Sequence, residues 1–300
     1  MLPFHTSDVF ATTPYAGNPL AVVLDAGSLT TAQMQTIAAE FNLSETIFVR
    51  PALHPAHTAE VRIFFPTGEI PFAGHPTIGC AVLLAEMANG PGDWECLITL
   101  EEQAGLVPVS VIRRAGITTA ELTAPVIPHA CPDQTIAPLG VIAAALGLAE
   151  TDIGFDNHRP GIWAGGPAFI YVPVSGLPAL ARAHVQEPAW SALTAFDPQI
   201  GVYLYTTGTD VDFQARMFAP GSGIPEDPAT GSASAILAAQ LQAAGRIGPG
   251  TTRFRLRQGV EMGRSSEIGL TVEATAAALT AVRIAGSAVQ ISMGQLTPPA

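Results

Sequence analysis

Residues 219–241 read APGSGIPEDPATGSASAILAAQL, and residues 65–85 read FPTGEIPFAGHPTIGCAVLLA. Both stretches pass through a turn rich in proline and glycine into an apolar run that begins at a glycine, Gly74 in one and Gly231 in the other. An apolar run of this length after such a turn is typical of a buried helix. The repeat therefore predicts two similar lobes with pseudo-twofold symmetry.

The two copies differ in length. Aligning the Ile-Pro pairs at 70–71 and 224–225 leaves the second copy with three additional residues before its glycine. We place this insertion in the stretch that holds Glu226 and Asp227. The sequence thus puts an acidic pair at the helix start of the second lobe.

The length and composition are those of a large globular protein. Of the 300 residues, 48% are hydrophobic and 13% charged, which suits either one large domain or two domains of about 150 residues. We expect an N-terminal lobe at 1–126, completed by residues 284–300. The C-terminal lobe is expected at 127–283.

Hydrophobic periodicity and turn residues predict a mixture of short strands and helices. Strands are expected at 4–10, 19–25, 43–50, 59–66, several times within 95–126, and at 167–174, 200–206, 211–219 and most of 252–293. Helices are expected at 30–41, 76–88, 137–148, 188–195 and 232–244.

Several classes of function are excluded or disfavoured. All thirteen basic residues are arginine, so pyridoxal-phosphate Schiff bases, lysine nucleophiles and the lysine of a phosphate-binding loop are excluded. The formal net charge of -12 disfavours nucleic acid and anionic membrane surfaces as partners. The N-terminus shows no secretory signal and no apolar stretch is long enough to span a bilayer, which predicts a cytoplasmic protein. The spacing of Cys80, Cys96 and Cys131 fits neither a disulfide framework nor a zinc motif.

The two glycines mark candidate binding sites. A helix N-terminus presents unpaired backbone N–H groups and a partial positive charge, and glycine lets an anion approach the backbone. His75 and Ser232 follow these glycines, and either side chain could donate to an anion or relay a proton. Structural roles remain open at this point, with Ser232 as a plain N-cap and His75 as a packing residue.

Two carboxylates, Asp227 and Glu45, are candidate acid/base groups, and Glu226 stands beside the first of them. Asp227 stands before Pro228, which directs its backbone away from the helical region, although a solvated turn residue is an open alternative. Glu226 is expected to be the more exposed of the acidic pair. Strand alternation places Glu45 on an apolar face with Leu43, Ile47 and Val49. A carboxylate on such a face is either paired with an arginine or has its pKa raised by burial.

These motifs together resemble the PhzF-like family of phenazine biosynthesis. The residues that carry the resemblance follow one another in the family's order from residue 8 to about residue 290: Asp8-Val9-Phe10, Gly17-Asn18-Pro19, Leu43-Ser44-Glu45-Thr46, Arg62 to Phe65, Gly74-His75-Pro76-Thr77 and Glu226-Asp227-Pro228-Ala229-Thr230-Gly231-Ser232.

The resemblance implies an α+β fold like that of diaminopimelate epimerase. Each of two pseudo-symmetric lobes would be a curved, mostly antiparallel sheet wrapped around a central helix, with the active site between the lobes. It also implies an isomerase that needs neither cofactor nor metal. Related epimerases use one cysteine from each lobe, whereas here His75 and Ser232 occupy the corresponding positions.

The resemblance assigns roles to individual residues. It implies Glu45 as the acid/base group, supported by His75 and Asp227. Substrate binding is assigned to Asn18, Gly74, Gly231 and Ser232. The substrate would be a small carboxylated molecule, and a homodimer is the default expectation.

Two other functions remain open. A metabolite-binding protein could keep the site and lack turnover, in which case a ligand would bind without isotope exchange. A metal-dependent hydrolase with His and Asp ligands would instead show activity that is sensitive to chelators.

Overall fold

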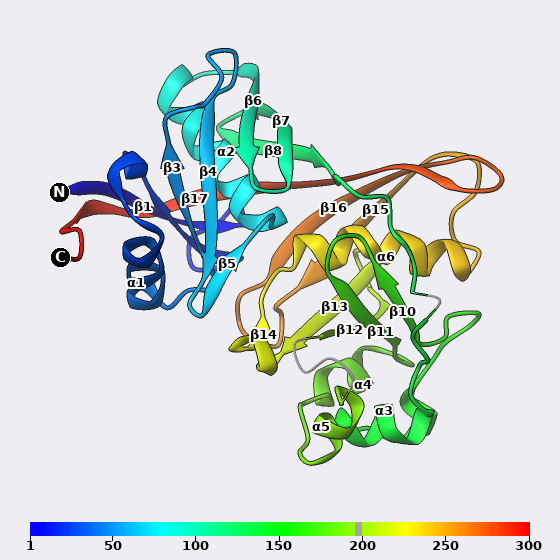
Figure 1. The fold of residues 1–300 in the computed structure, drawn as a ribbon. Helices are drawn as coiled ribbons and strands as arrows, with labels where there is room; N and C mark the ends of the chain where they lie inside the picture. Colours follow the sequence, from blue (N-terminus) through cyan, green and yellow to red (C-terminus); the bar gives the residue numbers. More distant parts are fainter. Residues whose placement is uncertain (132, 196–199) are drawn as a thin grey trace. The chain divides into compact units, whose positions relative to one another are not determined.

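The computed structural model describes residues 1–131, 133–195 and 200–300, which form a mixed α+β structure made mostly of strands (Figure 1). Contacts between Cα atoms divide the chain into two compact units. The first unit comprises Met1–Thr123, Arg264–Glu267 and Ile284–Ala300, and the second comprises Ala124–Gly263 and Ile268–Arg283.

The first unit is built on a sheet with mixed strand directions. Its elements are β1 (Leu2–Val9), β2 (Asn18–Val23), η1 (Ala26–Ser28), α1 (Thr31–Phe41), β3 (Glu45–Arg50), β4 (Ala59–Phe65), β5 (Gly68–Ile70), α2 (Gly74–Asn89), β6 (Trp94–Glu102), β7 (Gly105–Arg114) and β8 (Ile117–Thr123). Strand β2 runs parallel to β3, and β4 runs parallel to β6, while β3–β4 and β6–β7–β8 are antiparallel.

Helix α2 is the core element of the first unit. It contacts β1, β2, β3, β6, β7 and β8, and its residues from Gly74 to Leu83 are all buried. Helix α1 packs elsewhere on the sheet, where Met34 and Ile37 join Phe48 and Phe64 in a separate hydrophobic cluster. The apolar run that the sequence assigned to a buried helix is thus a buried helix.

The second unit repeats much of this order. Its elements are β9 (His129–Ala130), α3 (Leu139–Ala145), η2 (Glu150–Asp152), β10 (Gly161–Ala164), β11 (Ala168–Pro173), α4 (Leu177–Arg182), α5 (Ala189–Leu193), β12 (Gly201–Thr207), β13 (Phe213–Ala219), η3 (Pro220–Ser222), β14 (Ile224–Asp227), α6 (Gly231–Ala243), β15 (Gly250–Gln258) and most of β16 (Ser266–Ala274). Strand β17 (Leu279–Leu296) begins in the second unit and ends in the first, where it pairs with β1.

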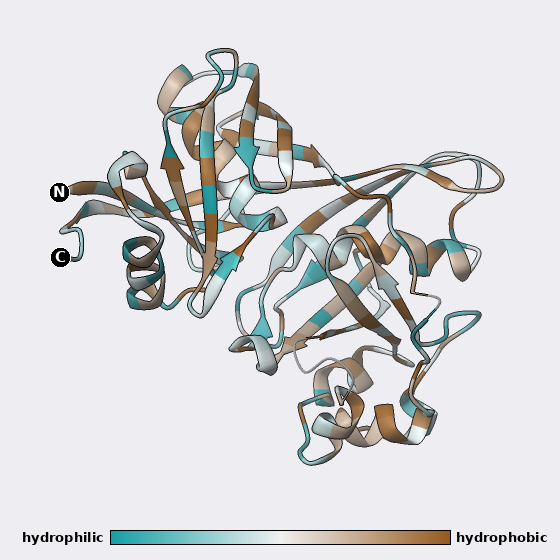
Figure 2. Ribbon diagram, in the orientation of Figure 1, coloured by the Kyte–Doolittle hydropathy of each residue, from teal (hydrophilic) through white to brown (hydrophobic). Residues whose placement is uncertain are grey.

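Buried apolar side chains hold the second unit together. Helices α3, α4 and α5 form one cluster with strands β11 and β12, which includes Ile142, Leu180, Trp190 and Val172. The brown colour of α3 in Figure 2 reflects this apolar composition. Helix α6 contacts β9, β10 and β11.

The sequence predicted α1, α2, α3, α5 and α6 but missed α4, and it predicted the helix ends less well. The helix expected at 137–148 is shorter, because Pro138 is its N-cap and Gly147 takes a positive φ of 63° soon after its end. The strand expected at 43–50 starts only at Glu45 and is buried along nearly its whole length. The predicted face therefore holds for Glu45, Ile47 and Val49 but not for Leu43, which lies outside the strand.

Each unit contains an equivalent ion pair that joins two consecutive strands of its sheet. Arg62 of β4 donates two hydrogen bonds to Glu69 of β5, and Arg216 of β13 donates two to Glu226 of β14. Each glutamate stands five residues before the glycine that begins the next helix. Glu226 therefore corresponds to Glu69.

This correspondence corrects the position of the insertion. The arginine and glutamate are seven residues apart in the first unit and ten in the second. Two of the three additional residues thus lie between β13 and β14, where the chain forms η3 and the connection has four residues against two between β4 and β5. The third lies at the register shift in the pairing of β13 with β14. The prediction that all three lie in the stretch that holds Glu226 and Asp227 is therefore wrong, because the alignment relied on the repeated Ile-Pro letters instead of strand pairing.

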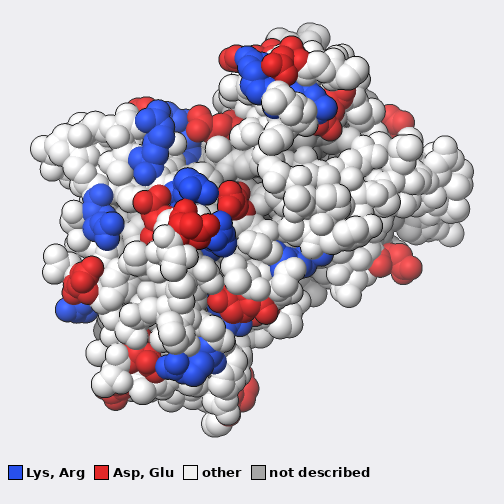
Figure 3. All heavy atoms as spheres, turned by 180° about the vertical axis from the view of Figure 1, so that it is seen from behind, with Lys and Arg blue, Asp and Glu red and all other residues white. Residues whose placement is uncertain are grey.

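In the described part of the chain, no helix is long and apolar enough to cross a membrane. Figure 3 shows arginine and acidic side chains next to one another on one face of the molecule. The described ion pairs include Arg50–Glu60, Arg113–Glu86 and Arg283–Glu273. Part of the basic charge is therefore neutralised by neighbouring carboxylates.

Candidate active site

Glu45 and His75 form a buried pair in the first unit. Glu45 is the first residue of β3, and His75 is the second residue of α2. The Nδ1 atom of His75 lies 3.2 Å from Oε2 of Glu45, and the two residues are only 3% and 9% exposed. Two predicted site residues that are thirty positions apart are thus brought into direct contact.

Asn18 is held near the start of the same sheet. It is buried and begins β2, two residues before Leu20, which is the register partner of Glu45. The turn before it is tight, since Gly17 has a φ of 69° and a Cβ there would lie 2.3 Å from the carbonyl oxygen of Val9. Only glycine fits this backbone without strain.

An ion pair fixes that turn. Nη2 of Arg264 lies 2.5 Å from Oδ1 of the buried Asp8, and the same guanidinium donates to the carbonyl oxygens of Ala16 and Gly17. The other carboxylate oxygen of Asp8 accepts a hydrogen bond of 2.6 Å from the backbone N–H of Tyr15. The loop that leads to Asn18 is therefore tied down from both sides.

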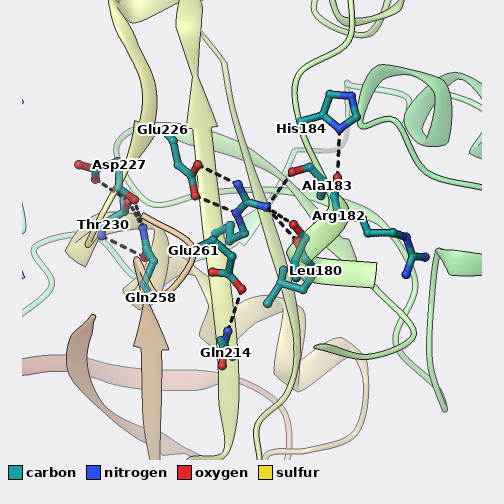
Figure 4. A network of polar contacts seen from close by, with 12 residues as sticks. Leu180, Arg182, Ala183, His184, Gln214, Glu226, Asp227, Thr230, Gln258 and Glu261 are labelled. Atoms are coloured by element: carbon teal, nitrogen blue, oxygen red, sulfur yellow. Dashed lines mark hydrogen bonds and ion pairs between the residues drawn. The ribbon is translucent and has the colours of Figure 1, made fainter. Parts of the chain in front are cut away.

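Asp227 lies in a buried polar cluster in the second unit (Figure 4). The hydroxyl of Thr230 donates to Oδ2 of Asp227 at 2.6 Å. The side-chain amide of Gln258 donates to the backbone oxygen of Asp227 at 2.7 Å and to Thr230 Oγ1 at 3.0 Å, and accepts from the backbone N–H of Thr230 at 3.1 Å. These bonds fix the carboxylate at the end of β14.

Glu226 has different hydrogen-bond partners from its neighbour Asp227. Its two carboxylate oxygens each accept a hydrogen bond of 2.8 Å from Arg216. Arg216 also donates to the backbone oxygens of Leu180 and Ala183 at the end of α4. The prediction that Glu226 is the more exposed of the acidic pair is confirmed, because its side chain is 18% exposed while Asp227 is 5% exposed.

Both central helices begin without a side-chain cap. The N-cap residues are Ala73 for α2 and Thr230 for α6, and neither side chain accepts a hydrogen bond from its helix. Gly74 and Gly231 are buried, and Ser232 is partly exposed. Ser232 is therefore the first residue after the glycine and not the N-cap that the sequence left open.

Buried tyrosines support the first turn of α6. The hydroxyl of Tyr171 donates to the backbone oxygen of Ala233 at 2.7 Å, and the hydroxyl of Tyr203 lies 3.2 Å from Ser234 Oγ. Burial raises the pKa of both phenols, so they stay neutral. The tyrosines thus brace the helix end that follows Asp227.

A pocket in the first unit contains none of the predicted site residues. It has a volume of about 410 Å³ and is lined by Arg50, Leu53, Glu60, Val61, Arg62, Glu69, Glu101, Glu102 and Gln103. Its two arginines are already paired, with Glu60 and Glu69 respectively. Within the described residues, no group of three or more His, Cys, Asp or Glu side chains is arranged to hold a metal ion.

Sequence reasoning missed the residues that hold the site residues in place. Two of these residues, Arg264 and Gln258, lie outside the motifs that suggested a site. Thr230 lies within such a motif but was given no role of its own. Thr230 precedes Gly231 and could have been identified as an N-cap type residue. Nothing in the local sequence distinguishes Arg264 or Gln258, since their partners are far away in the chain.

The chain is similar to a known protein family over almost all its length. The family described as phenazine biosynthesis-like protein matches residues 7–294. An uncharacterized isomerase of Mesorhizobium japonicum is 42% identical over 295 residues, which cover 96% of each chain. The trans-2,3-dihydro-3-hydroxyanthranilate isomerase of Pseudomonas chlororaphis is 35% identical over 294 residues, which cover 96% of this chain and 97% of that enzyme.

Solved structures show the same fold. A phenazine biosynthesis protein of the PhzF family from Bacillus anthracis superposes with a TM-score of 0.87 over 99% of each chain, at 24% sequence identity. A hydroxyproline epimerase from Agrobacterium vitis has a TM-score of 0.66 over 98% of this chain and 90% of the epimerase, at 16% identity. The fold is thus shared with PhzF proteins and with epimerases.

Proposed function

The chain belongs to the phenazine biosynthesis-like protein family and is an isomerase, and on this premise we propose that it moves a proton between two carbons of a small carboxylated substrate without a cofactor. Glu45 is the acid/base group in this proposal. The observation that carries it is the buried contact of 3.2 Å between Glu45 and His75 at the start of α2.

The proposed reaction conserves atoms and charge. The Glu45 carboxylate takes a proton from one carbon, and the electron pair of that C–H bond moves into the adjacent unsaturated system. The protonated Glu45 then returns the proton to a second carbon of that system, so the carboxylate is regenerated. A positioned general base contributes about 10² to 10⁴ in rate.

The other predicted residues bind and polarise the substrate in this proposal. His75 and Asp227 act on its amino or hydroxyl group, and Asn18 and Ser232 hydrogen-bond to it. The backbone at Gly74 and Gly231 receives the carboxylate, because each glycine begins a buried helix whose N-terminus carries partial positive charge. The proposal includes two pseudo-symmetric lobes, as expected for an epimerase-like fold.

Proton exchange in heavy water tests the proposal. Wild type, Glu45→Gln and the control Glu60→Gln are incubated with small unsaturated amino and hydroxy acids, including trans-2,3-dihydro-3-hydroxyanthranilate. We expect deuterium at carbon with wild type and Glu60→Gln, and a rate at least about 100-fold lower with Glu45→Gln. The control removes a glutamate from the neighbouring strand β4 that binds Arg50 instead of His75.

Other outcomes separate the alternatives. Equal exchange by Glu45→Gln and wild type would move the base to another residue. Binding of a compound without exchange by any protein would favour a metabolite-binding protein. Activity that a chelator abolishes would favour a metal-dependent hydrolase.

A further inference from the structure

Glu102 is a buried carboxyl group that the proposed reaction does not use. It is the last residue of β6 and is 8% exposed. Its Oε1 atom lies 2.6 Å from the hydroxyl oxygen of Thr77 in the first turn of α2. Its Oε2 atom is buried and has no hydrogen-bond partner among the described residues.

The hydrogens available at this contact favour a neutral acid. The hydroxyl of Thr77 has a single hydrogen to donate. Its oxygen, Oγ1, also lies 2.7 Å from the backbone oxygen of Ala73, which can only accept a hydrogen bond. If Thr77 donates to Ala73, the hydrogen between Thr77 and Glu102 must come from Glu102. A carboxylate would leave two acceptors competing for one hydrogen.

The second unit has an uncharged residue at the corresponding position. Ala59 of β4 pairs with Leu100 of β6, and Phe213 of β13 pairs with Leu256 of β15, both in parallel registers. Glu102 and Gln258 each stand two residues after these partners and each ends its strand. A carboxamide in one unit thus takes the place of the carboxyl in the other.

The two side chains have the same shape and similar surroundings. Gln258 bonds to Thr230, the N-cap of α6, and Glu102 bonds to Thr77 in the first turn of α2. A carboxamide and a neutral carboxylic acid can both donate and accept, whereas a carboxylate can only accept. We propose that Glu102 is a positioning residue that acts as a neutral acid in the role of Gln258, and that it holds the first turn of α2, which carries His75.

The surroundings of Glu102 stabilise the neutral form. Burial raises its pKa to about 8 and outweighs the hydrogen bond from Thr77, which lowers it. The thiol of Cys80, also on α2, is neutral because burial and the nearby Glu102 raise its pKa. Other charged groups on the packed strands and helix are engaged in pairs: Glu60 with Arg50, Arg62 with Glu69, Glu86 with Arg113 and Glu101 with His57.

Ionisation of Glu102 would release the helix start. The carboxylate would face the oxygen atoms of Thr77 and Ala73 with only one hydrogen between them. The first turn of α2 would therefore lose protection as pH rises toward about 8 and lose little more above it, because Glu102 is then ionised in the closed state as well. The consequence for catalysis rests on the proposed role of His75, but the loosening itself does not.

Hydrogen exchange measures the loosening without a substrate. Wild type, Glu102→Gln and the control Glu101→Gln are compared between pH 6.5 and 9.5, with rates corrected for the intrinsic effect of pH. In wild type we expect protection of the first turn of α2 at pH 9 to be about tenfold lower than at pH 7, as ionisation with a pKa of about 8 requires. Glu102→Gln should keep the pH 7 protection throughout, and Glu101→Gln should behave as wild type.

Carbon NMR of labelled glutamate carboxyl groups gives a second readout. A neutral carboxyl signal should be present at pH 7 in wild type and absent in Glu102→Gln. The proposal is overturned if no glutamate titrates above pH 6, or if Glu102→Gln loses protection at pH 7. Where proton-exchange activity is found, its decline at alkaline pH should also disappear in Glu102→Gln. A protein without that activity would leave both substrate-free readouts intact, so failure of the two proposals can be told apart.

Discussion

The Nδ1 atom of His158 lies 2.8 Å from the hydroxyl oxygen of Tyr205, and both residues are buried. Gln240 donates to the same hydroxyl at 3.0 Å, so the tyrosine hydrogen is directed to a neutral imidazole. The Nε2 atom of His158 has no hydrogen-bond partner among the described residues. Burial, with Arg246 and Arg159 nearby, lowers the pKa of His158 to about 4 although Asp156 opposes the shift.

This histidine should make the second unit sensitive to acid. The folded-state pKa of about 4 is below the unfolded value of 6.5, so the unfolded chain binds the proton more tightly. The stabilisation is complete above pH 6.5 and is lost as pH falls toward 4, by about 3 kcal/mol. Urea unfolding followed by the fluorescence of Trp163 and Trp190 measures this loss. His158→Gln should flatten the pH dependence, and the exposed His184→Gln should leave it unchanged; equal slopes for all three proteins would contradict the prediction.

The ion pair between Arg216 and Glu226 should contribute strongly to the stability of the second unit. Arg216→Met leaves the Glu226 carboxylate and the carbonyl oxygens of α4 without their donor. Breaking a buried pair in this way costs about 3 kcal/mol, measured as a shift of the urea midpoint. The exposed pair of Arg257 and Asp210 provides the control, since Asp210→Asn should cost less than about 1 kcal/mol. Similar losses in the two variants would mean that Arg216 is not an anchor.

Thr230 should affect turnover through Asp227. Thr230→Val keeps the side-chain shape and the backbone bond to Gln258 but removes the donor to the carboxylate and the hydroxyl that accepts from the Gln258 amide. A hydrogen bond to a charged group contributes about 1.5 to 3 kcal/mol, so we expect kcat to fall at least tenfold. Steady-state kinetics on a substrate found by proton exchange measures the change. Thr275→Val, at an exposed turn, should retain full activity, and a Thr230→Val enzyme with unchanged kcat would refute this role.

Arg264 should control the loop that leads to Asn18. Arg264→Met leaves the buried Asp8 without its ion pair and releases the carbonyl oxygens of Ala16 and Gly17. The expected loss of stability is about 3 kcal/mol, together with faster hydrogen exchange at the backbone of Tyr15 and Gly17. The double variant Asp8→Asn, Arg264→Met removes the unpaired charge, so it should recover stability without recovering protection of the loop. Recovery of both would show that only the charge matters.

Several residues of the candidate site could be proposed from the sequence because they lie in short motifs at helix starts. A turn followed by an apolar run identifies Gly74, His75 and Gly231 in the sequence. Glu45 was correctly predicted to share a strand face with Ile47 and Val49, but β3 is buried along nearly its whole length, so alternation does not single out that face. The contact between Glu45 and His75 depends on how β3 packs against α2. The alternation of apolar and polar residues along a strand does not predict that packing.

The supporting residues could not be predicted from local sequence. In the sequence Glu102 is the second of two adjacent glutamates at a strand end. Its burial results from the packing of β6 against α2, where it contacts Thr77. Glu226 was correctly expected to be the more exposed of the acidic pair, but nothing in the local sequence indicates that it binds an arginine on the preceding strand. In both cases the partner is set by strand pairing and packing, and repeated letters such as Ile-Pro gave a misleading alignment.

Strand β17 has a consequence for synthesis on the ribosome. Leu2 of β1 pairs with Leu296 of β17, which is made 294 residues later. Many multidomain proteins fold their N-terminal domain while the rest is still being translated. Here the first unit cannot complete its sheet until residue 296 has left the exit tunnel, so an unpaired β1 edge is exposed to chaperones or to other nascent chains throughout elongation.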